Sequence, residues 1–88
     1  MTAEQALERV TALTGASRET LLEVRLGPSA NPARRFVVWA LRRQTLLTQK
    51  DVGRVLGMSA QQVAHVLRRL DLHAEPFDTW SDKWLAEG

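Results

Sequence analysis

Apolar residues recur three or four positions apart over most of the chain, which is the spacing of one face of a helix. The run over residues 2–13 is followed by Gly15, and glycine favours the left-handed backbone at a helix end. Ser17 then offers an N-cap for a short second helix, which the pair Gly27 and Pro28 stops. The first third of the chain is therefore predicted to hold two helices.

The run from Phe36 to Leu41 is apolar on every side, as expected of a helix that other elements surround. Asn31 and Pro32 precede it, and these residues are favoured at the N-cap and at the first helical position. A short β-branched run is also compatible with a strand, but the arginines on both sides favour a helix. We therefore expect the central helix of the core here.

Residues 48–70 have the pattern of two short helices joined by a tight turn. Thr48 and Ser59 can each cap one helix, with Asp51 and Gln62 three residues later as capping-box partners. The apolar positions of this stretch are Val52, Val55, Leu56, Met58, Val63, Val66, Leu67 and Leu70. The pattern predicts a helix-turn-helix over residues 48–70.

Two glycines support the same prediction. Gly57 stands between the two helices, where a left-handed backbone is needed. Gly53 lies inside the first helix, where glycine costs about 1 kcal/mol relative to alanine. Close approach of the second helix would offset that cost, because a larger side chain would hold the two helices apart.

The last part of the chain, residues 76–88, is an acidic tail that contains Trp80 and Trp84. Thr79 can cap a final short helix, which would place the two tryptophans one turn apart on the same face. We expect this face to dock on the core. A homodimer contact, or a contact with another part of a parent protein, is the alternative role for Trp80 and Trp84.

These elements predict a single all-α domain, a small bundle of five to six helices that contains the helix-turn-helix. The chain has 88 residues and no cysteine, which excludes a disulfide framework and a thiolate metal site. No apolar run is long enough to span a bilayer, and the first ten residues lack the layout of a signal peptide. We expect a cytoplasmic protein that does not contact membranes.

Charge is distributed very unevenly along the chain, although the net charge is only +2. Residues 1–30 carry three basic and four acidic side chains, whereas residues 31–70 carry eight basic side chains against Asp51 alone. Residues 71–88 carry one basic and five acidic side chains. A basic block around a helix-turn-helix favours a nucleic-acid partner over a charge pattern that serves solubility alone.

A rotation of 100° per residue separates the two sides of the predicted groove helix, residues 59–70. Gln61, His65 and Arg68 fall opposite its apolar side and form an outward stripe. In the major groove, glutamine can bind adenine through N6 and N7, and arginine can bind guanine through O6 and N7. His65 can donate to a base or to a phosphate. Solvated polar residues with no partner are the competing interpretation.

Further basic residues are expected to contact phosphates. Lys50 and Arg54 lie on the helix that crosses the DNA backbone in this motif, and at least one of Arg68 and Arg69 is expected to hold phosphate. We expect no catalysis, no cofactor and no metal. The predicted DNA-binding residues are Ser59, Gln61, Gln62, His65, Arg68, Arg69, Lys50, Arg54, Arg34 and Arg35.

The stretches NPARRFVVWALRR and LTQKDVGRVLGMSAQQVAHVLRRL resemble the C-terminal DNA-binding domain of the bacterial replication initiator DnaA. They are more similar still to the related domain of REP-associated tyrosine transposases. The resemblance covers roughly residues 10–70. It implies that residues 59–70 read the major groove and that the loop over residues 25–35 reaches phosphates or the minor groove. The groove helix lacks the Asp-His pair of the initiators, so we expect a different target.

These observations predict a helical DNA-binding domain over residues 1–75, followed by the docked acidic tail. The expected function is a sequence-preferring, double-stranded DNA-binding module of a transposase-like or replication-initiator-like protein. One alternative is a transcription regulator or a sigma-like module. Another is a protein-interaction domain that has lost DNA binding, because a fold does not determine its function. A further hypothesis is that the acidic tail folds over the basic face and lowers its affinity for DNA.

Overall fold

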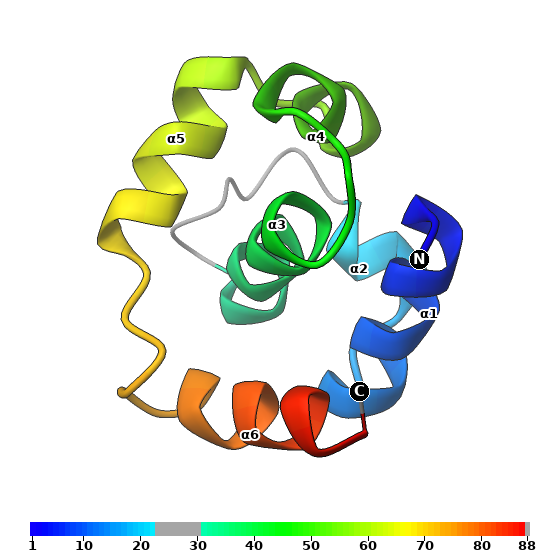
Figure 1. The fold of residues 1–88 in the computed structure, drawn as a ribbon, viewed down its shortest axis with the longest axis vertical. Helices are drawn as coiled ribbons and strands as arrows, with labels where there is room; N and C mark the ends of the chain where they lie inside the picture. Colours follow the sequence, from blue (N-terminus) through cyan, green and yellow to red (C-terminus); the bar gives the residue numbers. More distant parts are fainter. Residues whose placement is uncertain (23–30, 88) are drawn as a thin grey trace.

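The computed structural model describes residues 1–22 and 31–87. These residues form six helices and no strand, which confirms the prediction of a small all-α bundle (Figure 1). The predicted helix stop at Gly27 and Pro28 lies outside the described residues. None of the six described helices has the length and apolar character that a membrane crossing requires. The helices are α1 (Ala3–Thr14), α2 (Arg18–Leu21), α3 (Pro32–Arg43), α4 (Gln49–Leu56), α5 (Ala60–Arg69) and α6 (Phe77–Glu87).

Helix α3 lies at the centre of the molecule, and the other helices are arranged around it (Figure 1). Its run from Phe36 to Leu41 is buried throughout, as its apolar character on every side predicts. Helices α1, α2, α4 and α5 all contact α3, so each can bury its own apolar stripe against the same element. The core is therefore one cluster built on α3.

Local side-chain contacts determine where the helices begin. Thr2, Thr48 and Ser59 each form the N-cap of a helix, and each takes part in a complete capping box with the residue three positions later. Asn31 caps α3 by accepting a hydrogen bond from the backbone N–H of Arg34. These caps satisfy backbone donors that have no partner within the first turn of a helix.

Helices α4 and α5 pack against each other and are joined by the turn over residues 57–59. Gly57 has a φ of 71°, which confirms that a left-handed residue ends α4. The close neighbour of Gly53 is the turn rather than α5 itself, because a Cβ at this position would lie 2.4 Å from the carbonyl oxygen of Met58. The Met58 N–H donates to the Gly53 carbonyl at 2.8 Å, so the turn folds directly over the glycine.

Helix α6 begins at Phe77, so the predicted N-cap at Thr79 is wrong. Backbone N–H groups of the first turn donate to the carbonyls of residues 74 and 76, which precede the helix. The helix therefore begins earlier in the chain than the predicted cap. The ring of Trp84 is 2% exposed and packs edge-on against Phe36 and Trp39, with centroid distances of 6.3 and 5.9 Å. Aromatic packing therefore attaches α6 to α3.

The acidic tail does not fold over the basic helices, so the hypothesis that it covers the basic face is wrong. Helix α6 packs along α1, and Figure 1 shows it at the opposite end of the molecule from α4. Arg9 of α1 stacks on the Trp84 ring, 4.0 Å from its centre, and donates a hydrogen bond of 2.8 Å to the Trp84 carbonyl. These contacts hold the acidic helix on the α1 side.

Replacing Gly53 by alanine is expected to destabilise the fold, although alanine is the better helix former. The added methyl group would overlap the Met58 carbonyl, and overpacking of this kind costs about 1–3 kcal/mol. Denaturant unfolding of Gly53→Ala should show a lower free energy of unfolding. A gain of about 1 kcal/mol, as helix propensity alone predicts, would contradict the close approach of the turn.

Candidate nucleic-acid interface

One side of α5 is buried in the core and the other is open to solvent. Val63 and Val66 are 0% and 5% exposed, and they attach the helix to the bundle. The six predicted DNA-binding residues of α5 and its cap are all exposed, as are the two predicted on α4. These eight residues are Ser59, Gln61, Gln62, His65, Arg68 and Arg69 on α5 and its cap, with Lys50 and Arg54 on α4.

An open groove of about 930 Å³ runs along α5. Two of its lining residues come from other helices: Arg43 from the last position of α3 and Gln49 from the first position of α4. Sequence reasoning missed both, because a helical rotation treats one helix at a time. The residues that α5 and its cap contribute are Ser59, Gln61, Gln62, Ala64, His65, Val66, Leu67 and Arg68.

The two neighbouring glutamines at the start of α5 have different surroundings. The side-chain oxygen of Gln62 accepts a hydrogen bond of 2.8 Å from the Ser59 N–H, and the Ser59 hydroxyl accepts one of 3.1 Å from the Gln62 N–H. Gln62 and Ser59 therefore serve as the capping box of α5. The side chain of Gln61 is exposed and makes no hydrogen bond within the described part of the chain.

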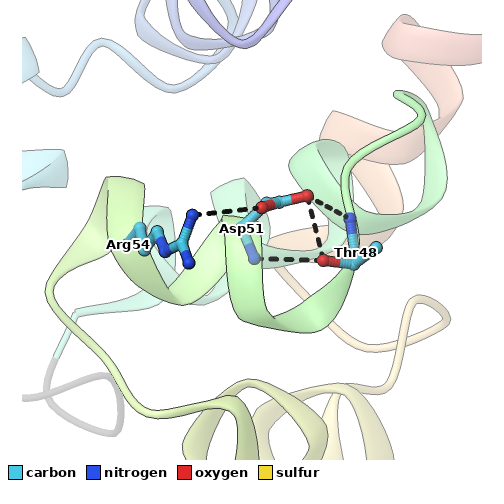
Figure 2. A network of polar contacts seen from close by, with 3 residues as sticks. All are labelled: Thr48, Asp51 and Arg54. Carbon is cyan, nitrogen blue, oxygen red and sulfur yellow. Dashed lines mark hydrogen bonds and ion pairs between the residues drawn. The ribbon is translucent and has the colours of Figure 1, made fainter.

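The start of α4 is held by a small polar network (Figure 2). The Thr48 hydroxyl donates to the Asp51 carboxylate at 2.9 Å, and the Asp51 N–H donates back to the Thr48 oxygen at 3.2 Å. The hydrogen bonds from Thr48 hold the pKa of the Asp51 carboxyl below its ordinary value. The Arg54 guanidinium lies 3.9 Å from Asp51 in an exposed pair, which is weak and leaves Arg54 able to turn to another anion.

Arg34 is the one predicted contact residue that the fold removes from the surface. Its side chain is 1% exposed, and its guanidinium donates to the carbonyls of Leu21, at 2.7 Å, and Leu56. These are the last residues of α2 and α4, whose carbonyls lack partners inside their own helices. The prediction that Arg34 contacts DNA is therefore wrong, since its donors bind two helix ends.

Arg35 is half-buried beside the start of α6. Its guanidinium carbon lies 5.1 Å from the centre of the Phe77 ring, which is a cation–π distance. The structure therefore separates it from the exposed basic residues of α4 and α5. Most of the loop over residues 25–35, which the family resemblance implicates in DNA binding, lies outside the described residues.

The exposed basic residues of α3, α4 and α5 are largely free of acidic partners. The ion pairs of the N-terminal helices join Arg18 to Glu4, and Arg9 to Glu87 at 3.8 Å. Within the described residues, no ion pair involves Arg43, Lys50, Arg68 or Arg69. The side of the molecule that carries the groove is therefore electropositive. The described residues also contain no group of three acidic, histidine or cysteine side chains that could hold a metal ion.

Comparison of the chain with protein-family models, with curated proteins and with solved structures found no match.

Replacing Arg34 by methionine should destabilise the fold. Methionine keeps a long side chain but leaves the Leu21 and Leu56 carbonyls without their donor, and a buried unsatisfied group costs about 1–3 kcal/mol. We expect urea unfolding to give a free energy at least about 2 kcal/mol lower. The matched variant Arg35→Met, at a half-buried neighbour, should change it less. Equal stability of Arg34→Met and the native chain would contradict the assignment.

The contribution of Asp51 to stability should depend on pH. Because its pKa in the folded state lies below that of the unfolded chain, the stabilisation is fully present above about pH 4 and disappears as the pH falls through the folded value. The native chain and Asp51→Asn should therefore differ in free energy of unfolding at pH 6, and this difference should shrink as the pH falls below about 4. A difference that grows on acidification would contradict this assignment.

Proposed function

We propose that this chain is a double-stranded DNA-binding module with sequence preference, in which α4, the turn and α5 act as a helix-turn-helix. The observation that carries the proposal is the two-sided character of α5. Val63 and Val66 are buried, while Gln61, His65 and Arg68 form an exposed polar stripe. A helix held by one side and polar on the other is suited to enter the major groove, which is about 12 Å wide.

The dimensions of α5 agree with this role. Its ten residues span about 15 Å, so one helix covers several base pairs. In helix-turn-helix proteins the first residues of the groove helix contact base edges. Gln61 stands in that first turn, whereas Arg68 lies about two turns further along and is better placed for a phosphate.

Phosphate contacts would come from the residues that flank α5. Lys50 and Arg54 of α4, and Arg43 at the end of α3, are exposed cations close to the groove or on the helix packed against α5. Such contacts release counterions from DNA and give an affinity that depends strongly on salt. They position the protein on the duplex, while the first turn of α5 reads base edges.

The resemblance to the DNA-binding domains of initiators and REP-associated transposases supports the same function. In those domains the buried helix precedes the groove helix in the chain, as α3 precedes α5 here. A transcription regulator would use the same surface, and the sequence of the bound DNA distinguishes the two. The protein-interaction alternative would use Trp80 and Trp84 of the acidic tail as a contact surface, but Trp84 is buried and Trp80 packs on Phe36, with a centroid distance of 5.5 Å.

Fluorescence anisotropy with a labelled duplex at several salt concentrations tests the proposal. With three to five phosphate contacts, the slope of log K against log salt should be about −2.7 to −4.5. Arg68→Ala should weaken binding to all sequences and reduce this slope by about 1 if Arg68 holds a phosphate. If Arg68 reads a base instead, the variant should lose preference at one position.

Lys83→Ala is the matched control, because Lys83 is an exposed cation on α6, on the far side from α4. It removes the same charge as Arg68→Ala and should leave the affinity nearly unchanged. An affinity that does not fall with salt, or an equal effect of both variants, would refute DNA binding through α5.

A further inference from the structure

The first turn of α5 offers two adjacent carboxamides, and the capping box uses one of them. A bidentate contact with adenine needs the amide oxygen of glutamine to accept from N6 and its NH₂ group to donate to N7. The oxygen of Gln62 already accepts from the Ser59 N–H at 2.8 Å. An amide oxygen can accept two hydrogen bonds, but the capping contact fixes the direction of the Gln62 carboxamide, which is therefore not free to turn its oxygen and its NH₂ group towards an adenine edge.

Gln61 has no such restriction. It is exposed, lines the groove and makes no side-chain hydrogen bond among the described residues, so both ends of its carboxamide are available. The capping box of Ser59 and Gln62 fixes the backbone of the first turn, and with it the position of the Gln61 Cα atom from which the side chain extends. Ala64, about one turn further along the helix, also lines the groove, and an alanine side chain can contact the methyl group of thymine in the major groove.

We propose that Gln61 is the specificity-determining residue of the interface and reads the adenine of an A·T pair through N6 and N7. This inference rests on the proposed DNA-binding function. Gln62 acts as a positioning residue, because its contact with Ser59 orients the turn from which Gln61 projects. Arg68 and the cations of α3 and α4 then determine the affinity for the duplex, and Gln61 determines the base sequence at which the protein binds.

The test begins with a duplex selected from a random pool by the native protein. Each adenine of that duplex is then replaced in turn by 7-deazaadenine, which lacks the N7 acceptor but keeps the pairing with thymine. Gln61→Ala loses both contacts and should bind the parent duplex about 5- to 150-fold more weakly than the native chain does. At one position the replacement, which removes only the N7 contact, should weaken binding of the native chain by a smaller factor and should have no effect on Gln61→Ala.

Two further variants separate reading from folding. Gln61→Glu has only acceptor oxygens and should shift the preference at the same position towards cytosine, whose N4 is a donor. Gln62→Ala removes the capping partner, so it should lower the melting temperature and weaken the preference at that position without changing which base is preferred. Circular dichroism of all variants checks that the helices remain.

The outcomes distinguish the two proposals. If the native chain shows no salt-dependent affinity for any duplex, DNA binding itself is refuted and the role of Gln61 with it. If the native chain binds a preferred sequence and Gln61→Ala keeps every base preference, DNA binding stands and the assignment of Gln61 is overturned. Loss of the preference in Gln62→Ala, with Gln61→Ala unchanged, would also overturn it.

Discussion

The position of α4, and through it that of the groove, depends on one buried guanidinium. Arg34 projects from the first turn of α3 and binds the last carbonyls of α2 and α4. A helix C-terminus carries partial negative charge and carbonyls without partners, so a buried cation there is stabilised where it would otherwise be costly. A single side chain thus joins three helices, and the end of α4 that it holds leads directly into the turn before α5.

The turn between α4 and α5 fixes the orientation of α5 relative to α4. Gly53 lets the Met58 carbonyl approach, Gly57 takes the left-handed backbone, and Ser59 caps the next helix. Each contact spans only a few residues, so the turn has little freedom once α4 is in place. The buried side of α5 is then determined by Val63 and Val66, and its opposite side must face solvent.

The packing of α6 on α3 and α1 keeps the acidic residues of α6 apart from the exposed basic residues of α4 and α5. The aromatic side of α6 packs on Phe36 and Trp39 of α3, and Arg9 of α1 covers the Trp84 ring. The acidic residues of α6 therefore lie away from the exposed cations of α4 and α5. This separation leaves the basic side of the molecule open to a polyanion and supports the proposed role.

Local contacts explain what could be predicted from the sequence alone. The all-α class, the buried run of α3, the caps at Thr48 and Ser59 and the outward side of α5 all follow from residues within one or two turns of each other. Capping and helical periodicity act over such short distances, so they can be read directly. That these residues bind DNA stays a prediction from charge and chemistry.

The packing of the helices determines which of the predicted contact residues remain exposed. Arg34 had the same sequence character as its neighbour Arg35, but its partners lie 13 and 22 residues away and meet only when the helices pack. The addition of Arg43 and Gln49 to the groove, and the place of α6 beside α1, likewise depend on long-range packing. Such contacts leave no local pattern, because a buried arginine and a surface arginine differ only in what the rest of the chain brings to them.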